Sequence, residues 1–393
     1  MLGSLIVICA ATAELMPLSL AQALDLAQRH NPDLAVVQQR IPAARAGIDV
    51  AGALPNPTVG FNVGPDAPQY FWLLDQKLPI FGQRGSAISA AEADVPVAQA
   101  ELAVSSNQLR AAVRRSYAVL ALSQSQLELA RQTARLAQEL AQLTLKRYQT
   151  GSSPQFEAEQ GALVARRAEN EVLDRTSLLE VARIRLAQVL GVPPKSPIQA
   201  TDPLLPLPSV GTAEELLARA ENHPDLQVAR REREAAEARV QREQVAVRPV
   251  PTVSLQLEQF PSSLGLGLRT GMVFDAPVLS QNQGQIRTQQ VQVAQAEARY
   301  TAFAHRLQAD LSAARTRWES AVRRVRFFEE ELVPAAVRVA DLARIAYAVG
   351  RTPISNVLQA QRDLEAARIL GLEAAGEAWA ALADLEEASG ARF

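Results

Sequence analysis

Side chains alternate in character with a period of two in the segment Leu264-Gly-Leu-Gly-Leu-Arg-Thr-Gly-Met-Val-Phe-Asp275. One face of this segment, if extended, carries Leu264, Leu266, Leu268, Met272 and Phe274. The other face carries Gly265, Gly267, Arg269, Gly271 and Asp275. Such alternation over about ten residues is typical of a β-strand that crosses a membrane with its apolar face toward lipid.

Three more segments show the same alternation. The apolar residues at every second position are Val59, Phe61 and Val63 in the first, Tyr70, Trp72 and Leu74 in the second, and Val253, Leu255 and Leu257 in the third. We therefore expect strands at about 56–64, 69–79, 250–260 and 264–277, with these apolar residues facing lipid. Half-buried strands of a soluble sheet are the alternative, but they need a second layer to cover the apolar face.

Four strands are too few to close a barrel, for which about eight is the working minimum. An open sheet edge inside hydrocarbon leaves backbone N–H and C=O groups unpaired, which is costly. If these strands face lipid, several copies of the chain must contribute to one shared barrel.

The sequence contains a tandem repeat. Asn31-Pro32-Asp33-Leu34 recurs as His223-Pro224-Asp225-Leu226, and Tyr148-x-x-Gly151-x-x-Pro154 recurs as Tyr347-x-x-Gly350-x-x-Pro353. Leu78-Pro79-Ile80 is echoed by Ala276-Pro277-Val278, in the same order along the chain. We expect two repeats, residues 14–192 and 211–393, joined by a Pro-rich connector at 193–210, because proline-rich chain cannot be helical.

Long amphipathic helices flank the strands. In the second repeat, apolar residues from Tyr300 to Leu332 alternate steps of four and three, which is the pattern of a coiled coil. No clear stop signal interrupts residues 83–149 or 282–349, although Pro96 and Pro334 are expected to bend these helices. Pro42 is likewise expected to kink the helix that starts at Asn31 and Pro32.

The N-terminal segment is typical of a secretory signal. An apolar run from Leu5 is followed by Ala11-Thr12-Ala13, which fits a signal-peptidase site. The run is short and no basic residue precedes it, so we expect a signal peptide over residues 1–13 that is complete or continues upstream; a frayed helix is the alternative. The single cysteine, Cys9, lies in this run, so the mature chain has no thiol chemistry.

Composition excludes several function classes. The 40 basic and 42 acidic residues give no positive excess, so nucleic acid is not an expected partner. The three histidines are scattered, and no catalytic, phosphate-binding or metal-binding motif occurs. We therefore expect no catalytic residues, no metal site and no cofactor.

The order of these motifs resembles the outer-membrane efflux factors, the TolC-like channels of tripartite pumps. The resemblance rests on the duplication, on Leu20-x-x-Ala23-Leu24 before Asn31, on the strand exit Leu78-Pro79-Ile80-Phe81-Gly82-Gln83-Arg84-Gly85, and on the paired Tyr-x-x-Gly turns. The exit motif resembles the heavy-metal branch more than the drug branch.

The resemblance implies a mainly α fold with a small transmembrane β part. Long coiled-coil hairpins form an α-barrel, and each of three protomers gives four strands to a twelve-stranded β-barrel in the outer membrane. Such a homotrimer spans into the periplasm, meets a periplasmic adaptor and an inner-membrane pump, and conducts substrates passively. The turns formed by Tyr148, Gly151, Pro154, Tyr347, Gly350 and Pro353 would lie at the periplasmic tip.

Members of that family hold the tip closed by polar and ionic links between hairpins. Here Glu157 matches an acidic family position, whereas Asn356 and Gln359 occupy positions that are often acidic. Arg351 lies next to a position where some relatives carry a latching arginine. We hypothesise that Arg351 and Glu157 form a closing pair between neighbouring hairpins, with Tyr347 beside them; solvated turn residues are the alternative.

Two other functions stay open at this point. A secreted or periplasmic coiled-coil tether without a pore would also contain long helices, but it has no use for the alternation in 264–275. A periplasmic adaptor normally has one hairpin with flanking β-rich domains, whereas this chain has two hairpins with strand pairs between the helices.

Overall fold

The computed structural model describes residues 15–65, 68, 70–260 and 265–390 of the chain. The predicted signal segment, Gln69 and Leu264 therefore lie outside the described residues. The chain divides into two compact units. One consists of the segment up to Leu34, Ser106–Glu221 and the segment from Leu307; the other consists of Ala35–Ser105 and Asn222–Arg306.

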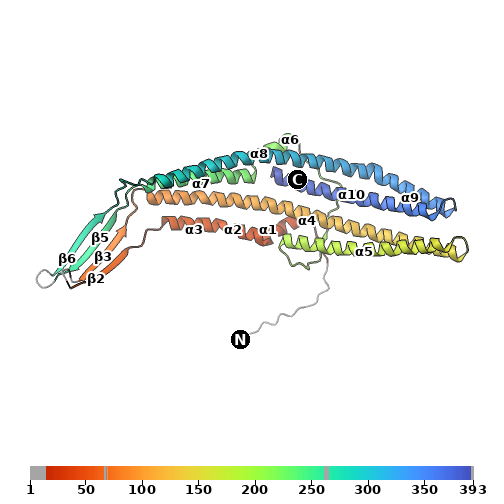
Figure 1. The fold of residues 1–393 in the computed structure, drawn as a ribbon, viewed down its shortest axis with the longest axis horizontal. Helices are drawn as coiled ribbons and strands as arrows, with labels where there is room; N and C mark the ends of the chain where they lie inside the picture. Colours follow the sequence, from red (N-terminus) through yellow and green to blue (C-terminus); the bar gives the residue numbers. More distant parts are fainter. Residues whose placement is uncertain (1–14, 66–67, 69, 261–264, 391–393) are drawn as a thin grey trace, which may run out of the picture. The chain divides into compact units, whose positions relative to one another are not determined.

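Long helices and short strands alternate along the chain, as the fold class predicts (Figure 1). The strands are β1 Met16–Leu18, β2 Thr58–Val63, β3 Tyr70–Lys77, β4 Ile198–Ala200, β5 Thr252–Gln259 and β6 Leu266–Val273. The α-helices are α1 Leu20–His30, α2 Pro32–Gln38, α3 Arg40–Gly52, α4 Gln83–Gln149, α5 Gln155–Leu190, α6 Ala213–Ala220, α7 Pro224–Ala246, α8 Gln283–Phe327, α9 Val333–Ala348 and α10 Ile354–Ser389.

The three prolines that were expected to bend helices have three different outcomes. The ring of Pro42 conflicts with the carbonyl of Gln38, and α2 ends there before α3 begins. Pro96 is accommodated inside the continuous 67-residue helix α4. Before Pro334 the helix widens into one π-helical turn, η1 Phe328–Leu332, so helical structure still continues from α8 into α9.

Helices α5 and α10 are built alike. Each has 36 residues, starts after a proline in extended conformation (Pro154, Pro353) and is followed by a left-handed glycine (Gly191, Gly390). Proline cannot donate the N–H that a helix start leaves unpaired, and glycine adopts positive φ without a steric penalty. Both signals recur 199 residues apart, as the duplication predicts.

The first unit has its core where β1, β4, α1, α4 and α5 meet. Buried members of this core are Leu18, Ala23, Ala27, Val113, Tyr117, Leu120, Leu186, Leu190 and Ile198. The Tyr117 hydroxyl donates to the carbonyl of Leu18 (2.8 Å) and accepts from the N–H groups of Thr201 and Asp202 (both 3.1 Å). The Tyr117 hydroxyl of α4 therefore links β1 to the connector segment after β4 through hydrogen bonds.

Charged groups join α4 to α10 in the same unit. The buried Arg114 Nε lies 2.8 Å from Glu386 Oε2, and Arg114 also lies over the ring of Trp379. The Trp379 indole donates to the carbonyl of Leu204 (2.8 Å), so α10 contacts the connector as well. Removing one partner of this buried ion pair would leave an uncompensated charge, so the contact favours the observed packing of α10 on α4.

The second unit contains one antiparallel sheet of strand order β2-β3-β5-β6. In the central row Phe61 is opposite Trp72, Trp72 opposite Leu257, and Leu257 opposite Leu268. Strands β2 and β6 are the edges, with no further strand beside them among the described residues.

We predict that Tyr117→Phe lowers the free energy of unfolding by about 1–3 kcal/mol, because it removes a hydroxyl that bonds three backbone groups inside the core. Urea unfolding followed by circular dichroism measures the change. Tyr148→Phe is the matched control, because Tyr148 is exposed. Equal unfolding midpoints for the two variants would contradict the role assigned to Tyr117.

Candidate functional site

The two Tyr-x-x-Gly turns have the same backbone structure. The N–H of Gly151 donates to Tyr148 and the N–H of Ser152 donates to Arg147, at 2.9 and 2.8 Å. At the corresponding positions, Gly350 donates to Tyr347 and Arg351 donates to Ala346, also at 2.9 and 2.8 Å. Gly151 and Gly350 have φ of 71° and 74°, which favours glycine. The predicted turn residues therefore form two equivalent helix reversals.

The side chains of the two turns differ. Tyr148 is 41% exposed, whereas Tyr347 is 2% exposed and packs with Ile354, Val357 and Leu358. The same cluster includes Leu140 of α4 and Val164 of α5, so the α9–α10 hairpin packs against the α4–α5 hairpin next to the turns. Only the second tyrosine therefore links the two hairpins through its ring.

Tyr347 makes polar contacts with the first hairpin as well. Its hydroxyl donates to Glu157 Oε2 (3.1 Å), and the Arg147 guanidinium lies 4.6 Å from the centre of its ring. Arg147 Nη1 also donates to the carbonyl of Tyr347 (3.4 Å). A cation over an aromatic face adds about 0.5–1 kcal/mol at such partly exposed sites. Arg147, Glu157 and Tyr347 thus form one linked group, called here the tip triad.

Burial raises the pKa of the Tyr347 hydroxyl, and the hydrogen bond to Glu157 raises that pKa further. Both effects favour the neutral phenol, because a phenolate would be poorly solvated and would face a carboxylate. The contact between the hairpins therefore depends on a protonated Tyr347.

The other predicted gate residues lie outside the triad. Arg351 is exposed in the turn itself. Asn356 Nδ2 donates to Thr352 Oγ1 (2.7 Å), and Gln359 Nε2 donates to Asp363 Oδ1 (2.8 Å), so both amides bond within their own helix region. The structure brings Glu157 to Tyr347 in one chain and does not bring Glu157 to Arg351.

The role of Arg147 could not be predicted from the sequence. Its counterpart 199 residues later is Ala346, so the repeat gave no signal for it. The adjacent Tyr148 was in the motif, but the arginine before it contacts the tyrosine of the other repeat. A contact between non-equivalent positions of two repeats leaves no pattern in a single sequence.

The apolar residues of the four strands share one face of the sheet, as their cross-strand pairing requires. The members of this apolar face that are exposed are Val59, Phe61, Val63, Tyr70, Trp72, Leu74, Leu255, Leu257, Leu266, Leu268 and Met272. Val253 shares the face and is half-buried, and Phe274, just beyond β6, is exposed. No layer of the described chain covers these residues, so a contiguous apolar surface is left without partners.

The opposite face of the sheet carries charged and polar groups together with Phe71, Leu73 and Val273. It carries Asp75, Ser254, Glu258 and Arg269, and Arg269 Nη1 lies 3.4 Å from Glu258 Oε1. The charged side chains of the sheet therefore lie on one face and the contiguous exposed apolar residues on the other, as strands between lipid and water require.

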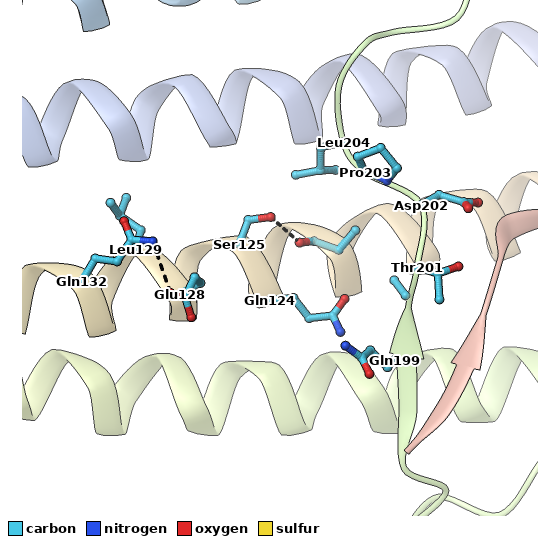
Figure 2. Close-up of a pocket in the computed structure, with 12 residues that line it drawn as sticks. Gln124, Ser125, Glu128, Leu129, Gln132, Gln199, Thr201, Asp202, Pro203 and Leu204 are labelled. Carbon is cyan, nitrogen blue, oxygen red and sulfur yellow. Dashed lines mark hydrogen bonds between the residues drawn. The ribbon is translucent and has the colours of Figure 1, made fainter. Parts of the chain in front are cut away.

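A shallow cleft of about 470 Å³ lies between α4 and the segment after β4 in the first unit (Figure 2). Gln124 of α4 and Gln199 of β4 face each other across it. Other polar groups of its lining bond within the chain: Asp202 accepts the N–H of Leu20 (2.7 Å), and Glu128 accepts from Gln132 (3.2 Å). These two carboxylates of the lining are therefore already engaged within the chain.

Among the described residues no group of three or more histidine, cysteine, aspartate or glutamate side chains is arranged to hold a metal ion. Within the same residues, no helix has the length and apolar character needed to cross a membrane.

Comparison with known proteins gives consistent matches. The family described as "Outer membrane efflux protein" matches residues 23–192 and 217–391. The chain is 26% identical over 377 residues to the cobalt-zinc-cadmium resistance protein CzcC of Cupriavidus metallidurans, covering 95% of this chain and 90% of that protein.

Solved structures share the fold. The outer membrane protein VceC of Vibrio cholerae has a TM-score of 0.76 at 19% identity, covering 95% of this chain and 96% of its own. A membrane protein of Pseudomonas aeruginosa has a TM-score of 0.79 at 18% identity, with 94% and 93% covered. CusC has a TM-score of 0.76 at 18% identity, with 94% and 91% covered.

We predict that Tyr347 ionises above the ordinary tyrosine value of about 10. The tyrosinate absorbance of the wild type minus that of Tyr347→Phe isolates this titration. Because the folded-state pKa is raised, the stability that neutral Tyr347 contributes is complete below about pH 10 and is lost as the pH rises through the folded-state value. Glu157→Gln should lower the titration midpoint of Tyr347 but leave it above the ordinary tyrosine value, because the Tyr347 hydroxyl is still buried. A midpoint at or below 10 would contradict the triad.

Proposed function

The chain belongs to the outer membrane efflux protein family, and from this premise we propose that three copies assemble into one duct whose tip is held shut by contacts between hairpins. As a member of this family it is an efflux channel of the bacterial outer membrane that reaches into the periplasm, with a TolC-like fold. Its proposed role is passive conduction, without catalysis.

One observation carries the proposal of a trimer: among the described residues the sheet is open at both edges, while all of its apolar face except Val253 is exposed. In hydrocarbon an edge without a partner strand costs several kcal/mol for each unpaired backbone group, so each edge must pair with another copy. Three copies of a four-stranded sheet bring together about twelve strands, an even number large enough to close.

The orientation of the strands follows from their two faces. The face with Phe61, Trp72 and Leu257 contacts outer-membrane lipid, and the face with Glu258 and Arg269 lines the lumen. The two repeats, residues 14–192 and 211–393 with the connector 193–210, supply one hairpin of strands and one hairpin of helices each.

The turns around Gly151 and Gly350 are proposed to form the periplasmic tip, where a periplasmic adaptor and an inner-membrane pump dock. Family members work as outer membrane channels in such tripartite systems. The similarity to CzcC over 95% of the chain supports heavy-metal ions as the cargo. The ions are selected elsewhere in the assembly, because the conduit only has to let them pass.

A closing latch at the tip is proposed between copies. Glu157 accepts the Tyr347 hydroxyl through Oε2 within its own chain, and a carboxylate has two oxygens that accept hydrogen bonds. Arg351 lies in the second turn, next to Gly350, and is exposed. The latch therefore joins Arg351 of one copy to the tip triad of the next.

The lipid-facing strands are tested by placing a charge on either face of β2. Phe61→Arg puts a cation on the apolar face in the middle row of the sheet, where the cost in a membrane barrel is about 2–4 kcal/mol. Asn62→Arg, one residue further, puts the same charge on the polar face and is the matched control. We predict that Phe61→Arg loses most of the trimer from the detergent-extracted outer membrane fraction, measured by native mass, whereas Asn62→Arg keeps it.

The same variants test the cargo. In a host that lacks the chain, wild type and Asn62→Arg should restore tolerance to cobalt, zinc and cadmium, and Phe61→Arg should not. If the wild type forms trimers but does not raise the metal tolerance of that host, the proposed channel is retained and heavy-metal ions are not its cargo. If the wild-type chain is a monomer that needs no detergent, the duct itself is wrong and a tether is left.

The latch is tested by the conductance of purified trimers in planar bilayers. An exposed ion pair contributes about 0–1 kcal/mol, so we predict that Arg351→Ala raises the open probability by up to about fivefold for each pair lost. Arg344→Ala is the control, because Arg344 is an exposed arginine of α9 whose Nη2 lies 3.6 Å from Asp341 of the same helix. An Arg351→Ala channel with the closed-state occupancy of the control would refute the latch.

A further inference from the structure

The two loops that lead from the sheet into the long helices share an unusual construction. In the first, the N–H of Ile80 donates to Leu78 (2.9 Å), and in the second, the N–H of Val278 donates to Ala276 (2.8 Å). Each hydrogen bond closes a three-residue turn around a proline, Pro79 or Pro277. Both turns directly follow the strand hairpins β2–β3 and β5–β6.

The helix starts that follow are also equivalent. Gly82 and Asn282 have φ of 92° and 58°, each one residue before its helix. The side chain of Gln83 accepts the N–H of Phe81 (3.0 Å), and the side chain of Gln283 accepts the N–H of Gln281 (3.2 Å). The loops are therefore held by defined hydrogen bonds at both ends.

These loops expose large apolar side chains in pairs. Ile80 and Phe81 are 65% and 48% exposed, and Val278 and Leu279 are 76% and 97% exposed. Single exposed apolar residues are common on protein surfaces and need no explanation. Here two pairs of adjacent exposed apolar residues lie at equivalent positions of the two repeats. Grouped apolar exposure of this kind marks an interaction surface.

The surroundings of these pairs indicate what covers them. Exposed Phe274 follows Met272 of the apolar face and precedes exposed Val278, so along the chain the loop continues directly from the strand whose face is proposed to contact lipid. Exposed cations in or next to these segments include Lys77, Arg84, Arg248 and Arg287, and Asp275 is an exposed acid of the second loop. Arg248 Nη1 donates to the carbonyl of Phe81 (2.7 Å), which places its charge beside the apolar pair.

We propose that Ile80, Phe81, Val278 and Leu279 form a membrane anchor that inserts into the periplasmic phospholipid leaflet of the outer membrane. The inference rests on the proposed function, because it needs the sheet to span that membrane. The apolar pairs enter the boundary between headgroups and acyl chains, and the flanking arginines and lysine contact lipid phosphates. A second copy of the chain would be the other possible cover, but it does not explain why the patch continues the lipid-facing surface.

Spin labels test the anchor in the assembled protein. Cys9 is replaced by serine, and single cysteines are introduced as Phe81→Cys, Leu279→Cys, Trp72→Cys and Leu342→Cys. The labelled oligomers are reconstituted in vesicles of phosphatidylethanolamine and phosphatidylglycerol. Trp72 reports the sheet face, and Leu342, exposed on α9, is the matched control in water. The accessibility of each label to oxygen, which concentrates in lipid, and to a water-soluble nickel complex is measured by electron paramagnetic resonance.

We expect the labels at positions 81 and 279 to favour oxygen over nickel severalfold, as the label at 72 does, and the label at 342 to favour nickel. Nickel-accessible labels at 81 and 279, with the label at 72 in lipid, would overturn the anchor and leave the duct intact. Labels at 81 and 279 protected from both reagents would also overturn it, in favour of a second copy. A water-exposed label at 72 would overturn both the anchor and the proposed function.

Discussion

The structure depends on one constraint: backbone N–H and C=O groups that leave water must find partners. In the sheet β2-β3-β5-β6, neighbouring strands pair their backbone groups with each other. The outward-facing backbone groups of the edge strands β2 and β6 have no partner strand among the described residues. Its apolar face has no covering layer in the described chain. In a membrane, pairing of edges between copies resolves both deficits, because it closes the ladder and leaves the apolar face on lipid. Under the proposed function, assembly of several copies completes the sheet that a single chain leaves open.

Much of this architecture could be predicted from the sequence, because it is periodic or repeated. The alternation around Phe61 and Leu257 predicted strands and their faces, and Gly151 and Gly350 predicted the helix reversals. The sequence predicted an interruption at Pro42, but it could not predict which effect each proline has on its helix. Pro42 ends α2, Pro96 stays inside α4, and Pro334 follows a π turn, and these outcomes depend on packing that one sequence does not display.

The tip was predicted only in outline. The motif located Tyr148 and Tyr347 in equivalent turns, but their burial differs almost completely, and Arg147 joins the second tyrosine although the repeat does not preserve it. Duplication gives two copies of a backbone, and the side chains then diverge to hold the copies together. The contact that links the two hairpins is consequently the part with the weakest sequence signal.

Helices α5 and α10 have equal lengths, and this length sets the distance from each turn to the glycine that follows the helix. At about 1.5 Å per residue, 36 residues place each turn about 54 Å from its C-terminal glycine. Deleting one residue in either helix would draw its turn back by about 1.5 Å and rotate every earlier side chain by about 100°. A change of length in only one of these two helices would therefore displace the two turns relative to each other, whereas the loops before α4 and α8 already differ in length between the repeats.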